Sequence, residues 1–567
     1  MPSDVEQTTT RADAPALLSI RDLEVCFSDR TGAHPVLHGI NVTVGEGERV
    51  AIVGESGSGK STIAAAVIGL LPGSGKVTRG TIEFRGEDVT HADEKRFRRL
   101  RGRQVGLVPQ DPMSNLNPVT RVGQQIAETL VAHGLASRSE AKRRAVDLMG
   151  EAGIPEAAGR ARQYPHEFSG GMRQRVLIAI ALACEPELLI ADEPTSALDV
   201  TVQRQILDHL ETLRAARGTS LLLVTHDLGL AADRADRVVV MSEGRVVESG
   251  PAEQILRDPQ DAYTQRLVAS APSVATSRAF FETGSSPTAT AVKEPEAPNA
   301  KSTEAQESPI LVVQDLVKVF KIRGRRGEPL TAVDHVSFST AAGTTTAIVG
   351  ESGSGKTTVA RMVLGLETPT SGEVRIGDDV VETARGTRRR AIRRTMQPVF
   401  QDPYASLNPT FTIEHIVDEP LRVFKVGDRR TRQRRVAALL DQVTLPRTIA
   451  QRYPNELSGG QRQRVAIARA LALDPRLMVC DEAVSALDVL VQDQILRLLA
   501  DLQRDLGLSF LFITHDLAVV RLIAHEVVVM REGRVVEAGD VTSVFDNPQS
   551  GYTRDLLEAI PGAEFFR

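Results

Sequence analysis

The chain has 567 residues and mixed charge, with 68 Lys and Arg against 73 Asp and Glu and a formal net charge of −5, so no global basic field favours nucleic acid. No apolar run reaches the roughly 18 residues of a membrane span, and residues 1–16 are polar, without the apolar core of a secretory signal. Hydrophobic residues make up 41%, enough for more than one core, and we expect a soluble chain.

Two further features of composition carry little specific signal. The cysteines Cys26, Cys184 and Cys480 are far apart and lack metal-ligand spacing; the latter two lie in apolar runs typical of core residues in a reducing compartment. Basic runs are interpreted as solvated helix faces, with a partner or lipid-headgroup contact as the alternative; they lie at 95–101, 388–390 and 429–435.

The order of segments along the chain predicts two domains. After the polar tail at 1–16, a first domain is expected at 17–272. Residues 273–308 are rich in Ser, Thr, Ala, Pro and Glu and predict a flexible linker. A second domain is expected at 309–567.

Each domain begins its functional motifs with a glycine-rich loop that follows an apolar strand. Residues 49–53 lead into Gly54-Glu55-Ser56-Gly57-Ser58-Gly59-Lys60-Ser61, and residues 345–349 lead into Gly350-Glu351-Ser352-Gly353-Ser354-Gly355-Lys356-Thr357. Both fit the pattern G-x-x-x-x-G-K-S/T, in which glycines turn backbone N–H groups toward phosphates. Lys60 and Lys356 would add charge near the β/γ oxygens, and Ser61 and Thr357 would offer hydroxyls to Mg²⁺.

A carboxylate pair closes a later apolar strand in each domain. Asp192 and Asp481 stand at predicted strand tips, where they could hold Mg²⁺ directly or through water. Glu193 and Glu482 follow them and could polarise an attacking water. An isolated Asp-Glu pair is usually a solvated loop, but the preceding apolar run and the upstream lysine favour the catalytic interpretation.

Two other polar residues recur at matching places. His226 and His515 follow apolar strands, and their recurrence favours a γ-phosphate contact over a structural role. Gln110 and Gln401 begin near-identical turn-rich segments and carry an amide that could reach the metal or water.

The spacing of these motifs shows a tandem duplication of a whole domain. Three pairs are each 289 residues apart: Ser169 and Ser458, Glu193 and Glu482, His226 and His515. Short apolar runs separated by helical stretches predict parallel strands with crossover helices, and hairpins are expected at 238–248 and 527–537. Each domain is therefore predicted to be α/β with an added antiparallel portion.

With these motifs in order, the chain resembles a fused pair of ATP-binding cassettes from an ABC transporter. The diagnostic segments are Phe168-Ser169-Gly170-Gly171-Met172-Arg173-Gln174-Arg175 and Leu457-Ser458-Gly459-Gly460-Gln461-Arg462-Gln463-Arg464, which resemble the family's signature. Ser196-Ala197-Leu198-Asp199 and Ser485-Ala486-Leu487-Asp488 resemble its D-loop. The resemblance implies two P-loop NTPase cassettes, each with a mainly parallel sheet, an antiparallel β portion and a helical subdomain.

The resemblance also implies how nucleotide is held. Ser169 and Gly171 would touch ATP bound by Lys356, while Ser458 and Gly460 would touch ATP bound by Lys60. Phe27 and Phe320 would stack on adenine, with a core role as the alternative for both. The remaining expected nucleotide contacts are Gly54, Gly57, Gly59, Thr62, Gly350, Gly353, Gly355 and Thr358. Two departures, Met172 opposite Gln461 and Ala483 opposite Pro194, remove no reacting group, so two competent sites are expected, with an unequal pair as the alternative.

Within the family, the details resemble ATPases of the peptide/nickel importer group. The resembling segments are Gln-Asp-Pro-x-x-x-Leu-Asn-Pro, Ser-Ala-Leu-Asp-Val-x-Val-Gln, and the tails at 259–264 and 548–553. This implies ATP hydrolysis coupled to uptake of dipeptides or oligopeptides, at the cytoplasmic face of the membrane. Two transmembrane permease subunits and an extracytoplasmic solute-binding protein would be the partners. No cysteine lies between Cys184 and Cys480, so no iron–sulfur cluster is expected.

The main alternative is a soluble double-cassette ATPase that acts on the ribosome. Such proteins resemble this chain in lacking membrane spans, but they typically join their halves by a long charged helix. The Pro- and Ser-rich segment at 273–308 does not fit that pattern.

Overall fold

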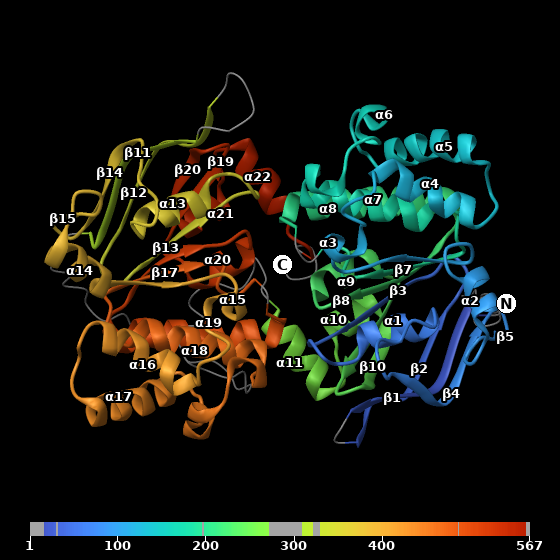
Figure 1. Cartoon of the computed structure of the whole chain (residues 1–567), viewed down its shortest axis with the longest axis horizontal. Coiled ribbons are helices and arrows are strands. Elements are labelled where there is room, and N and C mark those ends of the chain that lie inside the picture. The colour runs from blue at the N-terminus through green and yellow to red at the C-terminus, as the bar shows by residue number, and fades with distance from the viewer. Residues whose placement is uncertain are drawn as a thin grey trace, which may run out of the picture. The chain divides into compact units, whose positions relative to one another are not determined.

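The computed structural model describes residues 16–29, 32–195, 198–271, 309–320, 329–485 and 487–562. They form two compact units: the first comprises the described residues at 16–198 and 202–271, and the second comprises residues 199–201 and the described residues at 309–562 (Figure 1). The predicted linker and all but the last residue of the predicted tail lie outside the described residues. The predicted domain limits stay a prediction.

A six-stranded mixed sheet forms the centre of the first unit. Its order is β10-β9-β3-β8-β7-β6, with parallel pairing from β9 to β6 and an antiparallel β9–β10 hairpin at the edge. The strands are β3 (Arg49–Gly54), β6 (Val105–Val108), β7 (Leu188–Asp192), β8 (Ser220–Thr225), β9 (Arg237–Ser242) and β10 (Arg245–Pro251). Because parallel strands end at one edge, the residues after β3, β7 and β8 meet there.

A separate four-stranded antiparallel sheet completes the β portion of this unit. Its order is β2-β1-β4-β5, with strands β1 (Leu18–Asp29), β2 (Gly32–Val44), β4 (Lys76–Phe84) and β5 (Glu87–Asp88). Ile20 and Ile82 from this sheet share a core with Ile52 of β3 and Ile63 of α1 (Lys60–Val67). The helix that follows the phosphate loop therefore packs in a core shared with both sheets.

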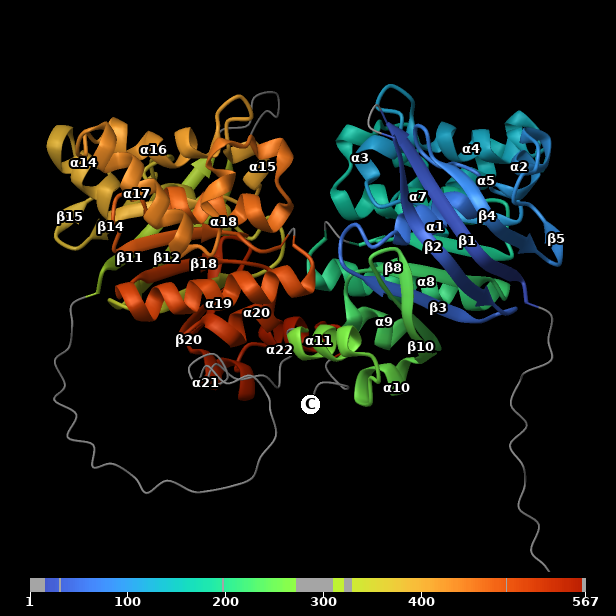
Figure 2. The same ribbon diagram turned by 90° about the horizontal axis from the view of Figure 1, so that it is seen from below.

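Helices α4, α5 and α7 form a helical subdomain with its own core, as predicted (Figure 2). That core includes Ile126, Leu130 and Val176. The remaining helices of the unit, with these three, are α2 (Glu94–Leu100), α3 (Pro112–Asn115), α4 (Val122–Ala132), α5 (Arg138–Glu151), α6 (Ala157–Arg160), α7 (Gly170–Leu182), α8 (Val200–Arg217), α9 (Leu228–Arg234), α10 (Ala252–Arg257) and α11 (Ala262–Ser270), and a short 3-10 helix spans Pro165–Glu167.

The second unit repeats this architecture. Its mixed sheet has the order β16-β17-β18-β13-β19-β20, and its antiparallel sheet has the order β12-β11-β14-β15. The strands are β11 (Leu311–Phe320), β12 (Leu330–Thr340), β13 (Thr345–Val349), β14 (Ser371–Ile376), β15 (Asp379–Val380), β16 (Met396–Val399), β17 (Leu477–Asp481), β18 (Ser509–Ile513), β19 (Glu526–Arg531) and β20 (Arg534–Asp540). The helices are α13 (Lys356–Val363), α14 (Gly386–Thr395), α15 (Pro403–Ser406), α16 (Ile413–Val423), α17 (Arg429–Gln442), α18 (Gly459–Leu471), α19 (Val489–Leu506), α20 (Leu517–Ile523), α21 (Val541–Asp546) and α22 (Gly551–Glu558), with 3-10 helices at Arg447–Gln451 and Pro454–Glu456. None of the helices in the described ranges combines the length and apolarity that a bilayer crossing requires.

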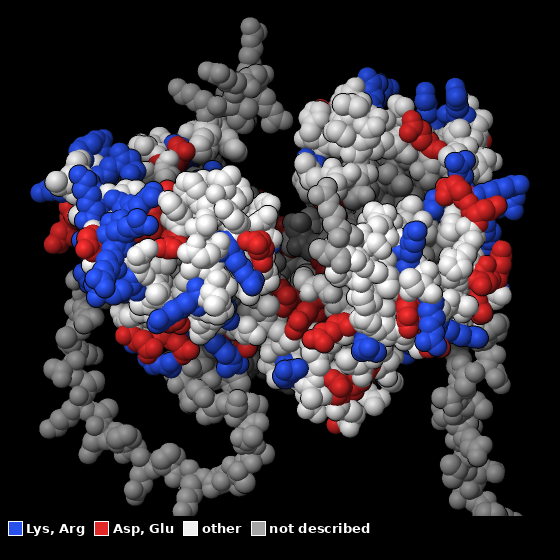
Figure 3. All heavy atoms as spheres, turned by 60° about the horizontal axis from the view of Figure 1, so that its bottom comes forward, with Lys and Arg blue, Asp and Glu red and all other residues white. Residues whose placement is uncertain are grey.

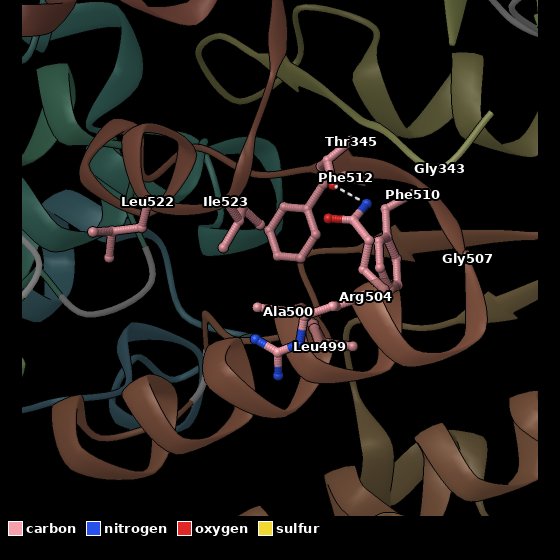
Figure 4. A pocket seen from close by; sticks show the side chains of 11 residues that line it. Gly343, Thr345, Leu499, Ala500, Arg504, Gly507, Phe510, Phe512, Leu522 and Ile523 are labelled. Atoms are coloured by element: carbon pink, nitrogen blue, oxygen red, sulfur yellow. Dashed lines mark hydrogen bonds between the residues drawn. The ribbon is translucent and has the colours of Figure 1, made fainter. Parts of the chain in front are cut away.

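The units differ in the packing of the long helix that follows the carboxylate pair. In the second unit a cavity of about 380 Å³ lies between α19, α20 and β18, and Figure 4 shows Phe510 and Phe512 lining it. The first unit has charged side chains at the corresponding places on α8, since Ala500 and Gln503 match Glu211 and Arg214 by the 289-residue offset. Glu211 and Arg214 form an ion pair of 2.6 Å, so this part of α8 carries a polar contact.

Basic residues gather on part of the surface of the second unit (Figure 3). On α14, Ile392 is buried while Arg388 and its neighbours are exposed. On α17, Arg432 and Arg435 pair with Asp418 and Asp474. Both helices thus bury an apolar side and present arginines outward.

Candidate nucleotide-binding sites

Each glycine-rich loop connects the central strand of the mixed sheet to a helix, and its backbone requires glycine. A Cβ on Gly54 would lie 2.2 Å from the Met241 carbonyl oxygen, and one on Gly350 would lie 2.1 Å from that of Met530. Gly59 and Gly355, which precede the helices, have φ of 99° and 101°, the left-handed region that glycine adopts without strain. The loop is therefore packed directly on β9 or β19, with helix α1 or α13 starting at the lysine.

The loop lysines are buried and bound by the loops themselves. Lys60 Nζ donates to the carbonyl oxygens of Gly54 and Glu55, each at 2.8 Å. Lys356 Nζ repeats this with Gly350 at 2.7 Å and Glu351 at 2.8 Å. Burial lowers the pKa of Lys356, against the opposing effect of nearby carboxylates such as Glu482. An ammonium group held by backbone carbonyls can be transferred to an anion, because a phosphate is the stronger acceptor.

The aspartate that closes the next strand faces the start of this helix. Ser61 Oγ donates to Asp192 Oδ1 at 3.0 Å. Burial raises the pKa of Asp192 and of Asp481, with the neighbouring glutamate adding to the effect. Asp481 Oδ1 is buried without a hydrogen-bond partner among the described residues, so this oxygen is free to accept a ligand. A hydroxyl and a carboxylate fit a hard cation such as Mg²⁺.

No group of three His, Cys, Asp or Glu suited to a metal occurs within the described ranges.

The adjacent glutamate is the point where distant segments converge. In the first unit, Glu193 accepts from Gln110 Nε2 at 2.8 Å through Oε2, and its Oε1 lies 3.2 Å from His226 Nδ1. In the second unit, Glu482 makes the same contacts with Gln401 at 2.5 Å and His515 at 3.4 Å. The structure thus brings together the three polar residues that the sequence predicted for each site.

The glutamate backbone is unusual in both units. Glu193 has φ of 44° and Glu482 has φ of 47°, in the left-handed region that a non-glycine residue adopts only at a cost. The Glu193 N–H donates to the Val224 carbonyl of β8 at 2.8 Å, and the Glu482 N–H donates to Ile513 at 2.9 Å, which holds this conformation. No residue type or motif in the sequence indicated this backbone conformation.

The electrostatics keep these glutamates ionised. Burial would raise the pKa of Glu193, but the hydrogen bond and charge of His226, together with the charge of Lys60, hold it below its ordinary value. For Glu482 the hydrogen bond from His515 has the largest effect and lowers the pKa against burial. Burial lowers the pKa of His226 and His515, but the neighbouring Glu193 and Glu482 raise it, and the net effect is a rise. An ionised carboxylate can orient a water molecule and accept its proton.

The signature residues belong to the helical subdomain. Ser169 Oγ accepts from the Met172 N–H and Ser458 Oγ accepts from the Gln461 N–H, both at 3.3 Å, so each serine caps a helix. A Cβ on Gly171 would lie 2.7 Å from Val202 Cγ1 of α8, and one on Gly460 would lie 2.4 Å from Val491. Each signature glycine is therefore required for close packing against the following long helix.

Met172 lacks the side-chain amide of Gln461, which acts as a hydrogen-bond acceptor in the second signature. Gln461 Oε1 accepts from the Ser458 N–H at 3.1 Å, which completes a reciprocal capping box that Met172 cannot form. The difference between the two signatures therefore lies in an acceptor.

The predicted adenine-stacking phenylalanines and the threonines after the loops lie within regular strands and helices. Phe27 packs partly buried against the core of the first unit, and Phe320 ends β11 with Lys318 Nζ 5.0 Å from its ring centroid. Thr62 and Thr358 are half-buried on the first turns of α1 and α13. Of the predicted D-loops, Ser196, Ala197 and Ala486 lie outside the described residues.

Two units that each place a phosphate loop, a strand-end Asp-Glu pair, a glutamine and a histidine together define a P-loop ATPase with two sites. The model of the ABC transporter family matches residues 37–196 and 333–485. A second model, that of the oligopeptide/dipeptide transporter C-terminal region, matches 247–296 and 536–565. The chain belongs to the ABC transporter family, and it is an ATPase of the group that carries this C-terminal region after both cassettes.

Relatives match along the whole chain. The glutathione import ATP-binding protein GsiA of Salmonella choleraesuis is 43% identical over 97% of this chain and 90% of its own length. GsiA of Escherichia coli O6:H1 has the same identity and coverage. Among solved structures, the ATP-binding cassette MJ0796 bound to ADP and Pi is 31% identical over 41% of this chain and 98% of its own, with a TM-score of 0.37.

Proposed function

We propose that both cassettes bind and hydrolyse MgATP to energise an importer of short peptides. The observation that carries this proposal is the arrangement around Glu193 and Glu482, repeated in both units. In each, an ionised glutamate is held between a glutamine amide and a histidine ring, next to a buried loop lysine.

The proposed chemistry divides among a few side chains. Lys60 and Lys356 leave their backbone carbonyls and bind the β/γ oxygens of ATP, while the loop N–H groups surround the phosphates. The residues that would hold Mg²⁺ are Ser61, Gln110 and Asp192 in one unit and Thr357, Gln401 and Asp481 in the other. A bound Mg²⁺ would neutralise charge that develops on the phosphate oxygens.

The glutamates are proposed to act as general bases. Glu193 and Glu482 orient a water in line with the γ-phosphate and accept its proton, because burial, histidine and lysine leave the carboxylate ionised. Gln110 and Gln401 fix one carboxylate oxygen, and His226 and His515 fix the other and extend toward the γ-phosphate. Adenine stacking by Phe27 and Phe320, and contacts from Thr62 and Thr358, belong to the same proposal.

The signatures complete each site in the proposed cycle. Ser169 and Gly171 would contact ATP held by Lys356, and Ser458 and Gly460 would contact ATP held by Lys60. The support is the family resemblance, together with helix starts whose N–H groups and capping serines suit an anion. ATP would then stabilise a closed state that hydrolysis releases.

The relatives support a proposal for the transported solute and the partners. The match to the C-terminal region supports dipeptides or oligopeptides, and the relatives named as glutathione importers extend this class to glutathione, itself a tripeptide. We propose two permease subunits, an extracytoplasmic solute-binding protein and a peripheral position at the cytoplasmic face of the membrane. The proposal includes domain limits at 17–272 and 309–567 and no iron–sulfur cluster.

The partners can be tested by purification of the tagged full-length chain from its native membrane in mild detergent. Co-purification of two permeases and a peptide-binding protein, with ATPase activity that peptide stimulates, is the expected result. Co-purification of ribosomal proteins instead would support the translation-factor alternative, which no comparison favours.

A further inference from the structure

The family-specific C-terminal region contacts the phosphate loop through one tyrosine in each unit. In the first unit, the Glu55 N–H donates to the Tyr263 hydroxyl of α11 at 3.2 Å. In the second, the Glu351 N–H donates to the Tyr552 hydroxyl of α22 at 3.1 Å. Both tyrosines lie within the segments matched by the oligopeptide/dipeptide transporter C-terminal model. The same contact thus occurs in both units, through the corresponding helices α11 and α22.

These hydrogen bonds fix a single peptide group at the start of each loop. The carbonyl oxygen of the Gly54–Glu55 peptide accepts from Lys60 Nζ, and the N–H of the same peptide donates to Tyr263. The Gly350–Glu351 peptide is held in the same way by Lys356 and Tyr552. Both polar atoms of one peptide plane are therefore engaged, which fixes its rotation.

The tyrosines are themselves firmly placed. Tyr263 and Tyr552 are each only 8% exposed, and Tyr552 shares a core with Val349, the residue before the loop. Burial raises the pKa of Tyr552 to about 12, so its hydroxyl stays neutral at physiological pH. A carboxylate of the edge strand holds the start of each helix: Glu248 accepts from the Gln260 and Asp261 N–H groups, and Glu537 accepts from those of Gln549 and Ser550.

We propose that Tyr263 and Tyr552 are positioning residues that keep the first peptide of each phosphate loop oriented when its lysine moves from the carbonyl oxygen to a phosphate. In the nucleotide-free loop, lysine and tyrosine hold this peptide together. Once the lysine binds phosphate, the tyrosine hydroxyl is the remaining restraint of the pair, and it prevents the peptide from rotating away from its binding geometry. The C-terminal region thereby contributes to nucleotide affinity in this group of cassettes. This inference rests on the proposed phosphate-binding role of the loops.

The test uses the full-length chain with Tyr263→Phe and Tyr552→Phe, singly and together. Phenylalanine keeps the buried ring but cannot accept the hydrogen bond. A net hydrogen bond of about 0.5–1.5 kcal/mol corresponds to an increase of about two- to tenfold in the KM and Kd for ATP, with a smaller change in kcat. Tyr453→Phe is the matched control, since it removes a hydroxyl from a ring that is 44% exposed, and its KM is expected to stay unchanged.

A second substitution separates positioning from packing. Tyr552→Leu removes ring and hydroxyl together, and its thermal unfolding is measured beside that of Tyr552→Phe. If the phenylalanine variants bind ATP like wild type and only leucine is harmful, the tyrosines act by packing and the proposal is wrong. If the wild-type chain binds no ATP at either loop, the phosphate-binding role itself fails, which is a distinguishable result.

Discussion

Replacing Glu482 by glutamine tests the chemistry of the second site with little change in shape. Glu482 Oε2 accepts from the Gln401 amide at 2.5 Å and its Oε1 lies 3.4 Å from His515 Nδ1. A glutamine at 482 has one oxygen and one NH₂ in place of two acceptor oxygens, and it cannot take a proton from water. Removal of such a base is expected to slow hydrolysis by about 10²- to 10⁴-fold, or about 3–5 kcal/mol in the barrier.

The assay is steady-state phosphate release by Glu482→Gln and Glu193→Gln, each made alone in the full-length chain. Because the two sites are proposed to work in one cycle, each single variant should fall far below half of the wild-type rate. Glu532→Gln is the matched control: it is an exposed glutamate that also has a left-handed backbone, with φ of 48°, and it should hydrolyse ATP normally. Wild-type turnover in either site variant would refute the assignment of these carboxylates.

Four further substitutions address the loops and the signature. Lys356→Ala should leave one ATP bound per chain by equilibrium dialysis; two bound would contradict the role of this lysine. Gly350→Ala places a methyl 2.1 Å from a carbonyl oxygen, so it should abolish ATP binding at that loop and lower the free energy of unfolding by about 3 kcal/mol. Gly353→Ala meets nothing within 4 Å and should lower it by only about 1 kcal/mol. Both values are measured by chemical unfolding followed by circular dichroism. Ser458→Ala removes a helix cap, with an expected loss of about 1 kcal/mol in the same unfolding measurement and a slower ATPase; unchanged values in both would contradict its two proposed roles.

Much of the fold was predictable because the same local sequence patterns occur in both halves of the chain. Apolar runs that ended in glycine-rich, Asp-Glu or His-Asp segments indicated parallel strands, and the structure confirms the mixed sheet with an antiparallel hairpin at its edge. The convergence of Gln110, Glu193 and His226 followed in part from the rule that parallel strands end at one edge.

Features that depend on tertiary contacts could not be predicted in this way. The left-handed backbone of Glu193 and Glu482 depends on hydrogen bonds to a neighbouring strand, and nothing in residue type signals it. Tyr263 lies 208 residues from Glu55, so only the folded chain shows that its hydroxyl meets the phosphate loop. The cavity beside α19 is lined by residues of β18, α19 and α20, and their packing against one another is not a local pattern of the sequence.

Occupancy of the two loops is the measurement that bears most directly on this chain as a two-site ATPase. The double variant Glu193→Gln with Glu482→Gln, incubated with Mg²⁺ and labelled ATP, should retain two unhydrolysed ATP molecules per chain. A stoichiometry of one, or continued hydrolysis in the double variant, would contradict the proposal that both cassettes bind ATP and use these glutamates to hydrolyse it.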